Sequence, residues 1–83
     1  MHEYSIVQAM FDQIERLRLD HRADAVRRIR VTIGEFAGVD PDLFQTAYDV
    51  YKIDTPCADA RLQIDRAAQS DALVLEQVEL EVR

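Results

Sequence analysis

Apolar residues recur at three- and four-residue spacing along the first twenty positions, which is the repeat of an amphipathic helix. Ser5 and Gln8 have the spacing of a capping box, in which two side chains satisfy amide groups at a helix start. The sequence therefore predicts a helix that starts at Ser5, with residues 1–4 projecting beyond its start. Its buried stripe would consist of Ile6, Val7, Met10, Phe11, Ile14 and Leu17.

Three later segments alternate apolar and polar residues with a period of two, as half-buried strands do. Their apolar positions are Ile29, Val31 and Ile33 in the first, Ala60, Leu62 and Ile64 in the second, and Val78, Leu80 and Val82 in the third. Leu73 and Leu75 have the opposite parity to Val78. This change of parity predicts a bulge near Glu76, unless both faces of the sheet are covered there.

A second helix is predicted between the first two strands. Gly34 and Gly38 interrupt the first strand, and Asp40-Pro41 then supplies an N-cap and a proline in the first turn. Thr55-Pro56 closes the segment, because proline cannot continue a helix. The expected buried stripe of this helix is Leu43, Phe44, Ala47, Tyr48 and Tyr51.

The order helix, strand, helix, strand, strand predicts an α+β fold with two helices on one face of a three-stranded mixed sheet. The first two strands would be joined by a right-handed crossover, and the last two by a hairpin. Arg28 and Arg30 on the first strand could face Glu79 and Glu81 on the third, which favours placing the third strand between the other two. If these charges are simply solvated, the strands would instead follow their sequence order.

Composition narrows the possible functions. The 83 residues, 48% of them hydrophobic and 31% charged, suit a single domain over residues 1–83. A formal net charge of −6 argues against nucleic-acid binding, and no apolar run reaches membrane-spanning length, so we expect a cytoplasmic protein. The single cysteine, Cys57, rules out a cysteine-rich zinc site within one chain. No nucleophile–base pair or phosphate loop indicates an enzyme.

Met1-His2-Glu3 is a candidate chelator of Ni(II) or Cu(II). The terminal amine, the His2 amide nitrogen and the His2 imidazole can close two fused chelate rings on a square-planar ion. A fourth donor could come from Glu3 or from backbone near it, and Glu3 could instead act as a carboxylate at the helix start. Because these nitrogens must lose protons to bind a metal, affinity should fall on acidification. His2 and His21 could also be ordinary solvated histidines.

Several segments together resemble the HypA/HybF family of nickel-incorporation proteins. They are Met1-His2-Glu3-Tyr4-Ser5, residues 33–39, residues 44–50, residues 60–64 and residues 78–82. The resemblance implies a nickel metallochaperone whose Met1, His2 and Glu3 bind Ni(II) for delivery to [NiFe] hydrogenase. It implies two partners, a nickel-handling GTPase of the HypB type and the hydrogenase large-subunit precursor.

The sequence departs from the family pattern at one place. The family carries two CxxC pairs that bind structural zinc, whereas residues 67–71 of this chain offer only a short polar turn, so we expect no zinc domain and no zinc. Cys57 lies upstream of that place and is expected to be a small loop or edge residue. Two alternatives remain open: a non-metal interaction module that docks through its charged sheet face, and a homodimer formed by strand exchange across the short turn.

Overall fold

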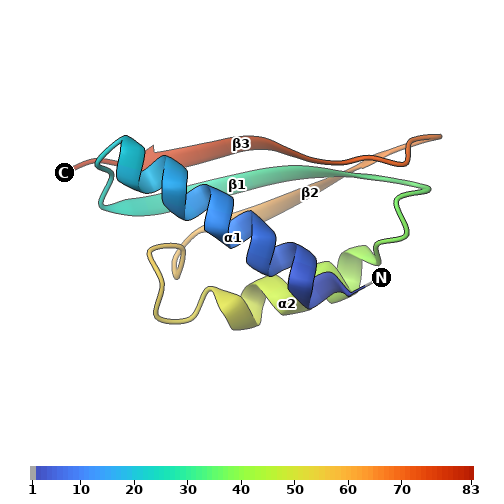
Figure 1. Cartoon of the computed structure of the whole chain (residues 1–83), viewed down its shortest axis with the longest axis horizontal. Coiled ribbons are helices and arrows are strands. Elements are labelled where there is room, and N and C mark those ends of the chain that lie inside the picture. The colour runs from blue at the N-terminus through green and yellow to red at the C-terminus, as the bar shows by residue number, and fades with distance from the viewer. Residues whose placement is uncertain (1) are drawn as a thin grey trace.

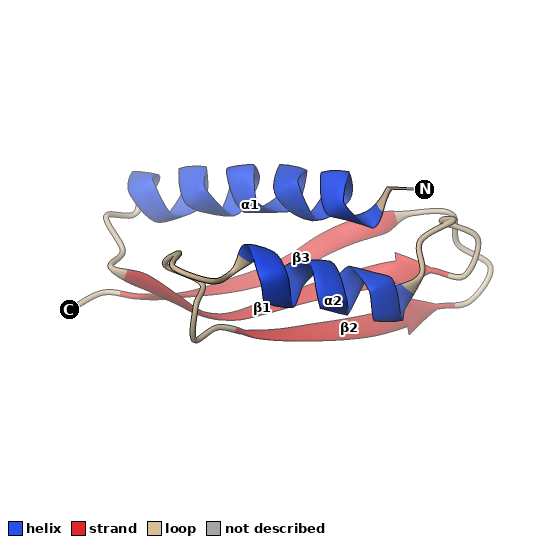
Figure 2. Cartoon of the chain, turned by 90° about the horizontal axis from the view of Figure 1, so that it is seen from below, coloured by secondary structure: helices blue, strands red, loops and turns tan. Residues whose placement is uncertain are grey.

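The computed structural model describes residues 2–83 and shows two helices on one face of a three-stranded sheet (Figures 1 and 2). The elements in chain order are α1 (Glu3–Asp20), β1 (Ala25–Gly34), α2 (Pro41–Tyr51), β2 (Arg61–Ala67) and β3 (Leu73–Glu81). This arrangement confirms the predicted α+β fold class. Neither helix in the described residues is long and apolar enough to cross a membrane.

The sheet has the strand order β2-β1-β3, with β1 in the centre. β1 pairs in parallel with β2 and antiparallel with β3. The placement of the last strand between the other two was therefore wrong, and so were the order 1-2-3 and the hairpin between β2 and β3. Opposite charges correctly indicated that Arg28 faces Glu79, but such a pair does not reveal which strand has neighbours on both edges.

A bulge on β3 shifts its pairing with β1. Arg30 pairs with Gln77 whereas Val31 pairs with Leu75, so Glu76 is the extra residue. The predicted bulge near Glu76 is confirmed. It allows Leu75 and Val78 both to pack against the core despite their three-residue spacing.

The core lies between the inner face of β1 and the two helices. Its fully buried members include Val7 of α1, Ile29, Val31 and Ile33 of β1, and Phe44, Ala47 and Tyr48 of α2. The hydroxyl of Tyr48 donates a 2.7 Å hydrogen bond to the Ala60 carbonyl, and burial raises the pKa of Tyr48. Leu43 does not belong to the buried stripe of α2, because it is 53% exposed.

The helix starts differ in how well the sequence predicts them. Asp40 caps α2 as expected, since its Oδ1 atom accepts hydrogen bonds from the amides of Asp42 and Leu43. The predicted start of α1 at Ser5 was wrong. The Ser5 amide donates to the His2 carbonyl at 3.1 Å, so Ser5 lies within the first turn and the helix begins at Glu3.

The polar connection between β2 and β3 passes the end of β1 at very close range. A Cβ atom on Gly34 would lie 2.3 Å from the Ser70 carbonyl oxygen, a backbone atom that cannot swing away. The Gly34 amide donates to the Ala72 carbonyl at 2.8 Å, and the Phe36 amide donates to the Ser70 carbonyl at 2.7 Å. Glycine at position 34 therefore lets the short connection reach from one edge of the sheet to the other.

Replacing Gly34 by alanine should lower the free energy of unfolding by about 2 kcal/mol or more, because the backbone must move to admit the methyl group. Gly38→Ala is the matched control, since its site is open but has φ of +72°, and it should cost only about 1 kcal/mol. Urea unfolding of both variants measures the difference. Equal stability of Gly34→Ala and the unsubstituted protein would contradict the close crossing.

Candidate metal site at the amino end of the first helix

His2 lies directly before α1 and is its N-cap residue, with φ of −87° and ψ of 94°. Its carbonyl accepts hydrogen bonds from the amides of Ser5 and Ile6, at 3.1 and 3.3 Å. Its side chain is exposed and makes no capping hydrogen bond. The His2 carbonyl oxygen thus takes part in the first helical turn, whereas its exposed imidazole makes no capping hydrogen bond. Met1, the other predicted nitrogen donor, lies outside the described residues.

Glu3 occupies the first turn of α1 and joins it to the start of α2. Its Oε2 atom accepts a hydrogen bond from the Asp40 amide at 3.2 Å. Two helix N-termini therefore meet at this carboxylate, where the helix dipoles favour negative charge. The bond involves one of its two oxygens. The expected helix-start role of Glu3 includes a contact between residues 37 positions apart, which no local spacing in the sequence could indicate.

Aromatic contacts hold this half of α1 on α2. The ring centroids of Tyr4 and Tyr51 lie 6.2 Å apart, and Phe11 lies 5.6 Å from Tyr48 and 5.9 Å from Tyr51. The Tyr51 hydroxyl also donates to the Gln8 side chain at 3.3 Å. These contacts explain why α1 extends beyond the predicted start, because the turn that contains Glu3 and Tyr4 is stabilised by packing and by the hydrogen bond from α2.

The other histidine is far from this end of the helix. His21 is exposed at the opposite end of α1, with its Nδ1 atom 2.8 Å from the Leu17 carbonyl oxygen. An 18-residue helix is roughly 27 Å long at about 1.5 Å per residue, so His2 and His21 of one chain cannot share an ion. Within residues 2–83, no three or more acidic, histidine or cysteine side chains form a metal-binding cluster.

Cys57 is a loop residue, as predicted, but it is buried rather than at an edge, with only 3% of its surface exposed. Burial raises the pKa of its thiol to about 11, the charge of Glu15 adds to this shift, and Arg18 partly opposes it. Metals bind the thiolate. Because the protonated form is favoured, Cys57 is poorly suited to ligate a metal at neutral pH.

Among the described residues, the amino end presents the backbone and the exposed imidazole of His2 as candidate donors. Donors at a chain terminus can adopt the coordination geometry that a metal ion prefers without a preformed binding site. Within residues 2–83, the side-chain candidates at this end are His2, which is exposed, and Glu3, which accepts a hydrogen bond from the Asp40 amide. The His2 side chain is open to solvent.

The chain matches a known protein family over nearly its whole length. Residues 1–82 match the family model described as "Hydrogenase/urease nickel incorporation, metallochaperone, hypA". The match includes the amino-terminal residues and the polar connection between β2 and β3.

Curated relatives carry the name "Hydrogenase maturation factor HypA". The protein of Shewanella baltica (strain OS185) is 44% identical over 64 residues, which cover 77% of this chain and 55% of that protein. The protein of Helicobacter hepaticus is 34% identical over 77 residues, which cover 92% and 62%. The chain therefore spans little more than half the length of the curated relatives it matches.

Two solved structures share the fold. The solution structure of the Ni metallochaperone HypA from Helicobacter pylori superposes with a TM-score of 0.85 over 100% of both chains, at 21% sequence identity. A second solution structure, of a HypA protein, gives a TM-score of 0.71 at 26% identity and covers 93% of this chain and 71% of the other.

The buried state of Cys57 should make its thiol slow to react in the folded protein. A rise in pKa from the ordinary 9.0 to about 11 lowers the thiolate fraction near neutral pH about a hundredfold, and burial restricts access further. Reaction with a thiol-specific disulfide reagent at mildly alkaline pH, with and without denaturing urea, measures this. Equal rates in the folded and unfolded protein would show that Cys57 is accessible.

Proposed function

Because this chain belongs to the HypA family of hydrogenase/urease nickel-incorporation metallochaperones, we propose that it binds Ni(II) at Met1, His2 and Glu3 and delivers it for [NiFe] hydrogenase maturation. The family consists of metallochaperones and not of enzymes. The observation that carries the proposal is the position of His2, exposed and directly ahead of the first helical turn.

The helix start suits the use of a backbone nitrogen as a ligand. The amide groups at the N-terminus of a helix have no partner within it, so binding a metal through the His2 amide breaks no helical hydrogen bond. The carbonyl of His2 can continue to accept from the amides of Ser5 and Ile6. Ni(II) would displace protons from the terminal amine, this amide and the imidazole, which makes affinity dependent on pH.

Glu3 supplies the fourth donor in this proposal. Its Oε2 atom accepts from the Asp40 amide, and the carboxylate has a second oxygen for the ion. A carboxylate shared in this way is the most replaceable of the four donors. A partner ligand could displace it first, which gives a route for transfer from an exposed site.

The proposed partners are a nickel-handling GTPase of the HypB type, which would participate in loading, and the hydrogenase large-subunit precursor, which would receive the ion. One chain supplies all the proposed ligands. Strand exchange between two chains would break the hydrogen bonds that Gly34 and Phe36 make with residues 70–72. We therefore propose that nickel binding requires no exchanged dimer.

Calorimetric titration with Ni(II), on protein with a native amino terminus, should show one ion per chain and weaker binding as the pH falls. His2→Ala should weaken binding at least about 100-fold, because it removes one chelate ring. His21→Ala, at the other end of α1, is the matched control and should have no effect. Unchanged affinity of His2→Ala would remove the metallochaperone proposal and favour the non-metal interaction module.

Two substitutions of Glu3 separate its proposed roles. Glu3→Gln keeps an oxygen that can accept from the Asp40 amide, so stability should remain within about 0.5 kcal/mol while nickel affinity falls several-fold. Glu3→Ala should lose the same affinity and about 1 kcal/mol of unfolding free energy as well. Nickel titration and urea unfolding measure the two effects. Full affinity in Glu3→Gln would leave Glu3 only its role at the helix start.

A further inference from the structure

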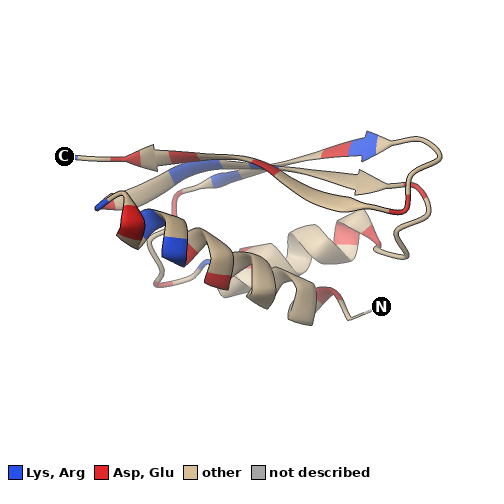
Figure 3. Cartoon of the chain, turned by 45° about the horizontal axis from the view of Figure 1, so that its top comes forward, with Lys and Arg blue, Asp and Glu red and all other residues tan. Residues whose placement is uncertain are grey.

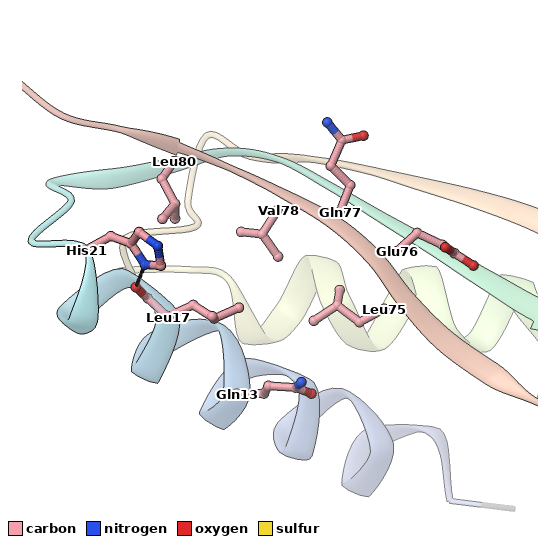
Figure 4. A pocket seen from close by; sticks show the side chains of 8 residues that line it. All are labelled: Gln13, Leu17, His21, Leu75, Glu76, Gln77, Val78 and Leu80. Carbon is pink, nitrogen blue, oxygen red and sulfur yellow. Dashed lines mark hydrogen bonds between the residues drawn. The ribbon is translucent and has the colours of Figure 1, made fainter.

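A groove separates the second half of α1 from β3. It encloses about 240 Å³, and apolar side chains from both elements line it: Leu17, Leu75, Val78 and Leu80 (Figure 4). His21 lies at one end of the groove, and its Nδ1 atom is hydrogen-bonded to the Leu17 carbonyl oxygen. These β3 side chains are only partly buried, although they lie against the core. The groove therefore offers apolar surface that this chain leaves open to solvent.

The groove runs beside an open sheet edge. β3 extends over nine residues and pairs with β1 along one side, and no strand within residues 2–83 pairs with its other side. The edge of such a strand presents unpaired backbone amides and carbonyls that can accept an added strand. An extended segment placed there would gain backbone hydrogen bonds and could direct every second side chain into the groove.

Charge determines what kind of segment fits. β3 carries Glu76, Glu79 and Glu81 and no basic residue, and Figure 3 shows acidic positions along this strand. A second copy of β3 paired about a two-fold axis would bring like charges close together, which is unfavourable. On its other side, β3 is matched by a basic neighbour, because Glu79 lies opposite Arg28 of β1. Within residues 2–83, Glu76 has no cross-strand partner on β1 and forms no ion pair, so its charge is left for a residue of the added segment.

We propose that the open edge of β3 binds an extended basic segment of a partner protein, in which apolar residues alternate with lysine or arginine. The apolar residues enter the groove between α1 and β3, and a basic residue lies beside Glu76, which also lines the groove. Glu76, the extra residue of the bulge, is exposed and has no cross-strand partner on β1, so its charge is available.

This surface is separate from the proposed nickel site. His2 precedes the first turn of α1, whereas the groove is lined by residues of its second half and by β3. The two proposals can therefore fail independently. The test uses protein without nickel.

The probe is a short peptide of alternating lysine and valine, blocked at both ends. It should shift the amide resonances of β3 and of residues 13–21 and slow amide exchange along β3. A matched peptide, N-methylated at alternate residues, keeps the charges but loses the donors needed for strand pairing, and should bind at least several-fold more weakly.

Charge reversal at the bulge gives a second measurement. Glu76→Lys should weaken binding of the unmethylated peptide about threefold, the size expected for one exposed ion pair. Asp12→Lys makes the same change of two charges at an exposed position on α1 that does not line the groove, and should reduce affinity clearly less. Unchanged thermal stability of both variants shows that the fold is intact.

Three results would overturn the proposal. Equal binding of the methylated peptide would show attraction by charge alone. Resonance shifts that avoid β3 would place the peptide elsewhere. Light scattering that shows a dimer, together with slow exchange of β3 amides in the absence of peptide, would identify a second copy as the occupant.

Discussion

Strand β1 has to be covered on both edges and on its inner face, and the other four elements are arranged around this requirement. Ile29, Val31 and Ile33 are fully buried, and burial of each such side chain contributes about 1.5 to 3 kcal/mol. β2 and β3 pair with the two edges of β1, and the helices cover its inner face. The same arrangement forces the connection after β2 past the end of β1, where Gly34 leaves room for it.

Local patterns in the sequence were sufficient for the elements, the fold class, the cap at Asp40 and the bulge at Glu76, because each depends on residues a few positions apart. Two errors have a common origin in long-range contacts. The start of α1 depends on the bond between Glu3 and Asp40 and on the packing of Tyr4, and the strand order depends on which strand has two paired edges. For the candidate site, the sequence indicated candidate donors, which remain a prediction, but it could not show that Glu3 contacts α2.

Helix α1 lies next to both proposed binding sites. Its first turn is held on α2 by aromatic rings and by the Glu3 carboxylate, so the proposed donor atoms of His2 lie at a well-supported helix end. Its second half covers the core only in part and leaves the groove beside β3. The proposed nickel site thus precedes the first turn of this helix, whereas the groove lies beside its second half. A partner bound along β3 would leave the amino terminus free to transfer an ion.

We propose that amine, amide and imidazole nitrogens at the amino terminus hold the nickel ion. Nuclear magnetic resonance of nickel-loaded protein with a native amino terminus tests it most directly, because square-planar Ni(II) of this kind is diamagnetic. We expect shifted but sharp resonances for the His2 ring and little change at His21. Paramagnetic broadening, or shifts centred on His21 or on acidic side chains away from Glu3, would contradict it.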